Sequence, residues 1–230
     1  MRASTALVLL SCVALTACKK KADAVATLPA ESAPATAASP AATAAPAATA
    51  ASADSTGAQR EIAKKQALLD YGSMEDRYMN DATAQWAATA TASSTFGDDG
   101  GKVPSDGNLA KNVIGAVDGK EWTNNHQDIG FDWIETTFVK PVNATEVRAV
   151  FANGAGVEAV NKVELQDTEG KWYTVWSGIS DVKRDARGSR TWFVRTFAKT
   201  AYKAKAVKLT IANNVEHVYK VVDAVQLVGN

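Results

Sequence analysis

From residue 86 onward, apolar and polar residues alternate with a period of two, and this pattern constrains the fold more than any other feature of the chain. The alternation is clearest in residues 207–211 and recurs in residues 172–176 and 192–195. It predicts strands with one buried face, separated by turn signals such as Glu169-Gly170. Eight strands are predicted, over residues 86–95, 132–138, 144–151, 160–167, 171–177, 190–197, 205–212 and 221–228. Because no long helix separates them, we expect an all-β fold, an eight-stranded jelly-roll β-sandwich over residues 86–230.

Residues 59–85 have a helical pattern and are expected to form a bracket of short helices ahead of the sandwich. Apolar residues at helical spacing begin at Ile62, and Gly72 is expected to end the first helix. A capping-box pattern that starts at Ser73 predicts a second short helix. Met74 and Tyr78 share a face of this second helix, and we expect that face to pack on the edge of the domain.

Residues 1–18 have the features of a lipoprotein signal peptide. Arg2 supplies a positive start, and residues 6–13 form an apolar run that is too short to span a bilayer. The run ends in Leu-Thr-Ala followed by Cys18, which resembles the bacterial lipobox, in which the cysteine is lipidated and becomes the first residue of the mature chain. An ordinary secretory signal with an incidental cysteine is the alternative. Because Lys19 rather than aspartate follows Cys18, the resemblance implies sorting to the outer membrane, with acyl chains as the only membrane contact.

Residues 19–58 predict a disordered linker rich in Ala, Pro, Ser and Thr. Pro29, Pro34, Pro40 and Pro46 recur every five or six residues and interrupt any helix. The segment contains almost nothing large and apolar to bury. We expect it to hold the folded domain away from the membrane surface.

The balance of charge excludes one class of partner. The whole chain has 25 basic and 25 acidic residues, and residues 59–230 alone have 21 basic and 22 acidic residues, a formal charge of −1. A chain without a net positive field does not recruit phosphates by bulk charge, so a protein that coats nucleic acid is excluded.

Five short motifs follow one another in an order that resembles the discoidin, or coagulation-factor C-type, family of galactose-binding-like β-sandwiches. They are residues 90–94, 116–123, 132–138, 163–172 and 223–229. The resemblance covers about residues 86–230, and the discoidin-like glycan-binding domains attached to NAD-glycohydrolases are similar as well. It implies a domain that binds glycans, lipid headgroups or proteins and does not catalyse a reaction.

Long loops at one end of the sandwich are the expected binding region. If neighbouring strands are antiparallel, residues 96–131, 152–159, 178–189 and 213–220 emerge at the same end, and long loops on a rigid scaffold commonly carry binding residues. An aromatic face with amide, imidazole and guanidinium groups suits a sugar. The candidate ligand-binding residues are Trp122, Asn124, Asn125, His126, Arg184, Arg187 and His217. A tryptophan in the core and a solvated charged loop are the structural alternatives.

The resemblance also implies a structural calcium ion in these loops. Asp118 and Thr123 match the first part of the family's calcium motif. The position of its C-terminal glutamate is occupied by Ala224, and Asp223 precedes it on what should be the opposite face of the strand. Because Ca²⁺ takes six to eight oxygen ligands, the missing carboxylate weakens this assignment. No cofactor is required, and calcium is one candidate.

The sequence therefore predicts a lipid-anchored, non-catalytic module of the bacterial cell envelope that recognises glycan. It has no Gly-x-Ser-x-Gly, His-Glu-x-x-His or phosphate-loop motif, and no cysteine follows Cys18. Two alternatives stay open. One is an interaction lipoprotein that docks another envelope protein, which predicts an exposed apolar patch on a sheet face. The other is a hydrolase with a metal centre at His126 and His217, which requires the two imidazoles to lie close together.

Overall fold

The computed structural model describes residues 49–100 and 102–230, and the side chains of residues 56–100 and 102–230. The predicted signal peptide, Cys18 and residues 19–48 of the predicted linker lie outside the described residues. None of the described helices combines the length and the apolar character that a membrane span requires.

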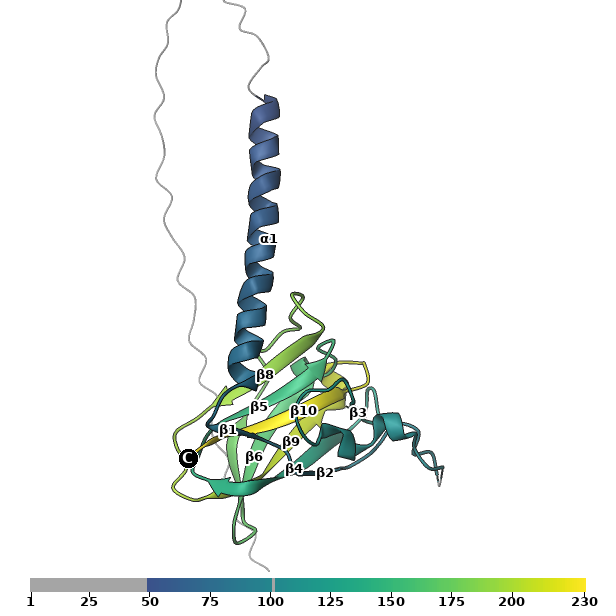
Figure 1. Cartoon of the computed structure of the whole chain (residues 1–230). Helices are drawn as coiled ribbons and strands as arrows, with labels where there is room; N and C mark the ends of the chain where they lie inside the picture. Colours follow the sequence, from purple (N-terminus) through teal and green to yellow (C-terminus); the bar gives the residue numbers. More distant parts are fainter. Residues whose placement is uncertain (1–48, 101) are drawn as a thin grey trace, which may run out of the picture. The chain divides into compact units, whose positions relative to one another are not determined.

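Two antiparallel sheets form the β-sandwich (Figure 1). The first sheet has the order β1 (Ala84–Trp86), β10 (Val221–Gly229), β5 (Ala144–Ala152) and β8 (Arg190–Thr196), and β3 (Trp122–Thr123) also pairs with β10. The second sheet has the order β2 (Thr89–Ala92), β4 (Phe131–Val142), β9 (Ala204–Ala212), β6 (Val160–Asp167) and β7 (Trp172–Ser177). The predicted all-β sandwich is confirmed, with ten strands in place of eight.

The two additional strands have simple physical causes. The predicted strand 86–95 is divided because the chain crosses from one sheet to the other at Ala87 and Ala88. The backbone N–H of Ala87 donates to Val225 in the first sheet, and that of Ala88 donates to Thr137 in the second. The other addition, β3, is only two residues long, which is too short to show an alternating pattern.

The core lies between the two sheets and follows the period of two. In β9, Val207, Leu209 and Ile211 are fully buried, whereas Lys208 and Thr210 between them are partly exposed. The connections between the sheets are short 3₁₀ turns and loops, and residues 106–108, 110–113, 157–159 and 213–215 form the 3₁₀ turns.

A single helix, α1 (Thr49–Met79), precedes the sandwich where two short helices were predicted. Gly72 does not end it, and the Ser73 hydroxyl donates to the Leu69 carbonyl one turn back at 2.9 Å instead of capping a new helix. The helix also begins at Thr49, inside the range predicted as linker. Pro46 is the last proline before it, and alanine is the strongest helix former.

The last turns of α1 are fixed to the outer face of the first sheet. Met74 and Tyr78, which share a face as predicted, pack with Trp192, and the Tyr78 and Trp192 ring centroids are 5.0 Å apart. The Glu75 carboxylate accepts two hydrogen bonds from the Arg190 guanidinium at 2.9 and 3.0 Å. These contacts offset the cost of glycine inside a helix, about 1 kcal/mol, which explains why α1 continues past residue 72.

Candidate functional site

The longer connections meet at one end of the sandwich, as the antiparallel arrangement predicts. Backbone hydrogen bonds join these loops directly. Asn213 donates to Gly130 at 3.0 Å, and Val221 donates to Ala155 at 3.1 Å. We refer to residues 93–100, 102–130, 153–159, 178–189 and 213–220 together as the loop end.

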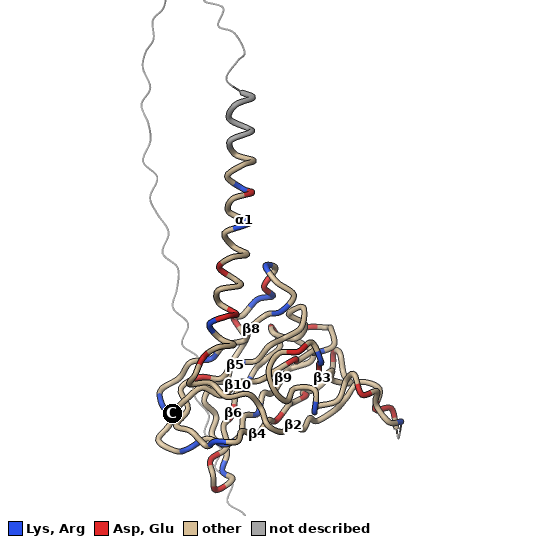
Figure 2. The backbone as a smooth tube through the Cα atoms, viewed as in Figure 1, with Lys and Arg blue, Asp and Glu red and all other residues tan. Residues whose placement is uncertain are grey.

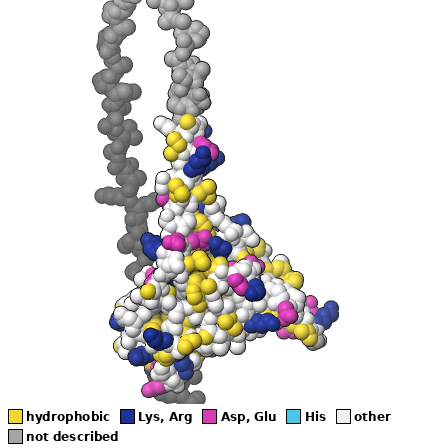
Figure 3. All heavy atoms as spheres, viewed as in Figure 1, with side chains coloured by type: hydrophobic (Ala, Val, Ile, Leu, Met, Phe, Trp, Pro, Cys, Tyr) yellow, Lys and Arg dark blue, Asp and Glu magenta, His cyan; other side chains and the backbone are white. Residues whose placement is uncertain are grey.

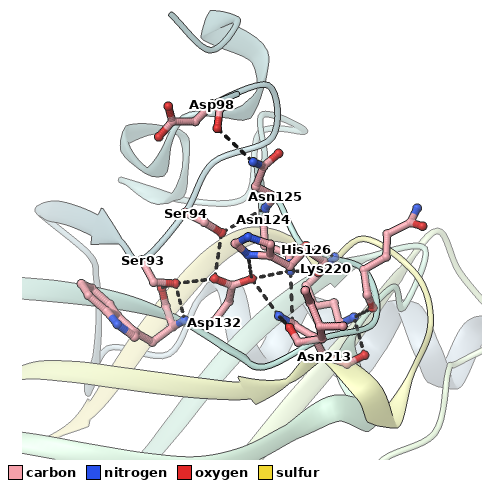
Figure 4. Close-up of polar contacts among 12 residues, drawn as sticks. Ser93, Ser94, Asp98, Asn124, Asn125, His126, Asp132, Asn213 and Lys220 are labelled. Carbon is pink, nitrogen blue, oxygen red and sulfur yellow. Dashed lines mark hydrogen bonds and ion pairs between the residues drawn. The ribbon is translucent and has the colours of Figure 1, made fainter. Parts of the chain in front are cut away.

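Asp132, the second residue of β4, is the centre of a buried polar network at the loop end (Figure 4). Its carboxylate accepts hydrogen bonds from the hydroxyls of Ser93 and Ser94 at 2.7 and 2.8 Å. It also accepts them from the side-chain amides of Asn124 and Asn213 at 2.8 and 2.9 Å. Burial alone would raise the pKa of Asp132, but these hydrogen bonds outweigh it and hold the pKa below its ordinary value. The ionised carboxylate therefore connects the start of β4 to the loops that contain Ser93, Asn124 and Asn213.

Lys220 supplies the buried positive charge of the same network. Its side chain is fully buried, and its ammonium donates to the backbone carbonyl oxygens of Gln127 and Glu216, which lie in two different loops. Burial lowers the pKa of Lys220, and the carboxylates of Glu216, Asp132 and Asp128 oppose the shift. The loop end is thus organised by two buried charges of opposite sign.

Two of the predicted ligand-binding residues belong to the interior. Trp122 is 0 % exposed in the core, and its indole N–H donates to the Ser94 carbonyl at 2.9 Å. Asn124 is also 0 % exposed, and its amide bonds Asp132 and the backbone N–H of Lys220. Because neither side chain reaches the surface, the prediction of direct ligand contact is corrected to a structural role for both.

Three predicted residues remain at the surface of the loop end. The Asn125 amide bonds the backbone of Gly97 and Asp98 at 3.2 and 3.0 Å and so holds the preceding loop. The exposed imidazole of His126 has its Nδ1 3.3 Å from a carboxylate oxygen of Asp132. The exposed imidazole of His217 has its Nε2 3.1 Å from the carbonyl oxygen of Asn214. Asn125, His126 and His217 stay candidate ligand contacts.

The two predicted arginines differ in position. The stem of exposed Arg184 packs over Gly154, where a Cβ would lie 2.7 Å from its Cγ, so Arg184 belongs to the loop end. Arg187 instead pairs with Asp185 at 2.7 Å, and its guanidinium lies 5.6 Å from the centroid of the Tyr71 ring on α1. The structure therefore does not bring Arg187 together with the other candidates.

A groove of about 240 Å³ opens between the start of β4 and three of the loops, and the sequence reasoning missed it. Its exposed apolar members are Phe131, Ile179 and Val215. Its polar members include Glu158 and Asn161, and the Oδ1 atom of Asn161 is buried without a hydrogen-bond partner among the described residues. The complete lining is Phe131, Glu158, Ala159, Val160, Asn161, Gly178, Ile179, Ser180, Ala212 and Val215.

The alternation in β4 is the signal that could have revealed the groove. Asp132 and Ile134 face the interior, so Phe131 and Trp133 face outward. An aromatic ring at the outward-facing first position of a strand beside long loops has no core to fill. Phe131 is 63 % exposed, which makes it the aromatic surface that Trp122 was expected to supply.

The residues proposed for calcium do not fit a metal site. The Asp118 carboxylate bonds the backbone N–H and the ammonium of Lys120 at 2.9 and 2.6 Å. A β-bulge at Asp223 turns that residue toward the loop, where its carboxylate accepts the backbone N–H groups of Asp118 and Gly119. The carbonyl of Thr123 accepts a backbone N–H from the 93–101 loop. Across the described chain, no group of three or more His, Cys, Asp or Glu side chains is placed to hold a metal ion, which also gives the hydrolase alternative no support.

The fold and the loop end define the class of protein as an antiparallel β-sandwich with a surface groove among its long loops. No protein-family model and no curated protein matches the chain. Among solved structures, it is similar to chitosan-binding module 1 from a chitosanase/glucanase of Paenibacillus sp. IK-5, at 18 % identity over 62 % of this chain and 96 % of that chain, with a TM-score of 0.46.

It is also similar to the family 32 carbohydrate-binding module from NanJ of C. perfringens, solved in complex with galactose, at 14 % identity over 63 % of this chain and 98 % of that chain, with a TM-score of 0.45. These modules are discoidin-like in fold.

Proposed function

We propose that this chain is a non-catalytic glycan-binding module, held at the bacterial cell envelope by a lipid on Cys18. The observation that carries the proposal is the exposed Phe131 ring at the rim of a groove with mixed lining. A pyranose ring has an apolar C–H face and polar edges. The apolar face can stack on Phe131, while the hydroxyls bond the Glu158 carboxylate.

The distribution of charge supports recognition by shape and hydrogen bonding. Basic and acidic residues are interspersed along the described backbone (Figure 2), and on the visible face apolar and charged side chains are mixed (Figure 3). At the groove itself, Lys183 forms an ion pair with Glu158, which neutralises the carboxylate. A neutral sugar suits such a site better than a polyanion does.

Docking of another envelope protein through a sheet face finds less support. Among the large apolar side chains that are exposed in the described residues, only Phe131 and Val139 belong to a strand. The others lie on α1 or in the connections. A sheet face without an apolar patch is a poor docking surface, so we favour glycan binding.

A glycan array combined with a peptidoglycan pull-down tests the proposal. The wild-type chain should bind at least one class of glycan and retain binding after treatment with a chelator. No binding to any glycan or to peptidoglycan would refute glycan recognition.

The lipid anchor is tested separately, because it rests on the sequence around Cys18 alone. Wild-type protein should sediment with membranes, and its Cys18→Ser variant should be released into the soluble fraction of cells. A Cys12→Ser variant is the matched control, since Cys12 lies within the predicted signal and should be removed with it. Equal membrane association of the Cys18 variant and the wild type would contradict the anchor.

A further inference from the structure

The ammonium of Lys220 lies in a cage of backbone carbonyl oxygens (Figure 4). The Nζ atom is 2.7 Å from the oxygen of Gln127 and 3.1 Å from that of Asn213. It is 2.6 Å from the oxygens of both Glu216 and Val218. An ammonium has three N–H groups, so the four acceptors share them all and none remains for water.

The rest of Lys220 is also built into the loop end. Its backbone N–H donates to the Asn124 side chain at 2.7 Å, and its carbonyl accepts the backbone N–H of Asn124 at 3.3 Å. Gly156, with φ of +94°, lies against its aliphatic stem, where a Cβ would come within 2.7 Å of the lysine Cγ. One residue therefore contacts the loops 124–130, 153–159 and 213–218.

Two of these three loops also form walls of the groove, and the remaining one leads directly into its rim. Phe131 follows the first of them, Glu158 belongs to the second, and Val215 belongs to the third. Four carbonyl dipoles that converge on one point repel one another unless a cation occupies that point. The position of the groove walls thus depends on a positive charge at the Lys220 Nζ atom.

We propose that Lys220 is the built-in cation of the loop end: its ammonium takes the place that a bound metal ion has in oxygen-lined sites and fixes the three loops around the groove. It is a positioning residue and makes no contact with the ligand. The proposal concerns the integrity of the loops and holds whether or not a glycan is the ligand. It follows that removing the side chain beyond Cβ leaves a cage for a small exogenous ammonium ion.

Chemical rescue of the full chain tests this directly. Lys220→Ala removes atoms that correspond to propylammonium, so the variant should unfold roughly 10 °C below the wild type, and propylammonium chloride should restore part of that loss. Lys220→Met keeps an apolar stem in the cavity and should lose stability without rescue. Lys111→Ala is the matched control, because Lys111 is exposed, pairs with the exposed Asp106 and should change the melting temperature little.

Several results would overturn the proposal. One is a melting temperature of Lys220→Ala equal to that of the wild type. Another is an equal rise in the melting temperature of Lys220→Ala with propylammonium chloride and with choline chloride at matched ionic strength. The third is a calcium-dependent rise in the melting temperature of the wild type.

If the variants do not fold, a measurement on the wild type alone tests the cage. Lys220 is the only buried lysine among the described residues. NMR of the lysine ammonium groups should therefore show one signal that exchanges with water far more slowly than the rest, and the absence of such a signal would contradict the cage.

Discussion

Asp132 carries a negative charge that is almost completely buried, and its hydrogen bonds set how the loop end responds to pH. The pKa of Asp132 is lowered in the folded chain. A lowered folded pKa means that the group stabilises the fold above its unfolded pKa of about 4, and that this contribution is lost as the pH falls through the folded value.

We therefore expect wild-type stability to decline below about pH 4 more steeply than that of Asp132→Asn. At neutral pH the variant should lose about 3 kcal/mol of unfolding free energy, because hydrogen-bond donors are left facing a neutral amide. Denaturant unfolding at several pH values measures both effects. Asp106→Asn, at an exposed position, is the control. Parallel pH profiles for the wild type and Asp132→Asn would contradict the role of Asp132.

Gly156 and Gly115 provide a matched pair for the contact with Lys220. Both have positive φ, +94° and +91°, so alanine strains the backbone at either position. Only at Gly156 would the added Cβ meet Lys220, whereas nothing lies within 4 Å at Gly115. Gly156→Ala should therefore cost about 1–3 kcal/mol more unfolding free energy than Gly115→Ala. Equal losses in denaturant unfolding would show that the lysine stem does not constrain this turn.

Among the elements, α1 is held to the sandwich by a small set of polar contacts in its last turns. The Tyr71 hydroxyl lies 2.9 Å from both the Glu75 carboxylate and the Arg190 carbonyl. Burial, together with the hydrogen bond to Glu75, raises the pKa of Tyr71 to about 12. Because the folded pKa is above the unfolded value of about 10, the contribution of Tyr71 is complete below pH 10 and is lost as the pH rises toward 12.

This shift predicts that the contact of α1 with the sandwich weakens in alkali. Tyr71→Phe should flatten the fall in stability between about pH 10 and pH 12, since phenylalanine has no proton to lose. Denaturant unfolding across this range measures the effect. Burial also raises the pKa of Tyr202, so in an absorbance titration the late-ionising fraction should be smaller in Tyr71→Phe than in the wild type. Ionisation of all tyrosines together near pH 10 would contradict the burial of the Tyr71 hydroxyl between Glu75 and Arg190.

Strands such as β9 were predictable because they bury one face, and Val207, Leu209 and Ile211 show the resulting period of two. The continuous helix was not predictable, because tertiary contacts of Glu75 and Tyr78 overrule the local signals of Gly72 and Ser73. A bulge likewise defeats the alternation at Asp223.

At the site, the sequence located the loops and misassigned some of their side chains. Alternation and antiparallel pairing place Asn125, His126 and His217 at one end, as local rules suffice for that. Whether Trp122 faces a ligand or the core depends on packing between the sheets, which no local pattern contains. Phe131 could have been found from its outward register in β4.

For the molecule as a whole, near neutrality leaves the groove as the feature that distinguishes the loop end. The chain carries no net formal charge, and its charged groups at the groove are paired. Under the proposed function, recognition depends on stacking and hydrogen bonding at a surface whose loops are held by two buried charges, Asp132 and Lys220.

Isothermal titration calorimetry of two variants of β4 tests glycan binding at the groove. Phe131 and Val139 are both exposed on this strand, at 63 % and 85 %, but only Phe131 lines the groove. With the glycan that binds best on an array, Phe131→Ala should weaken binding on the order of tenfold, or about 1.4 kcal/mol, at an unchanged melting temperature. Val139→Ala should bind as tightly as the wild type. Wild-type affinity in Phe131→Ala would contradict glycan binding at this groove.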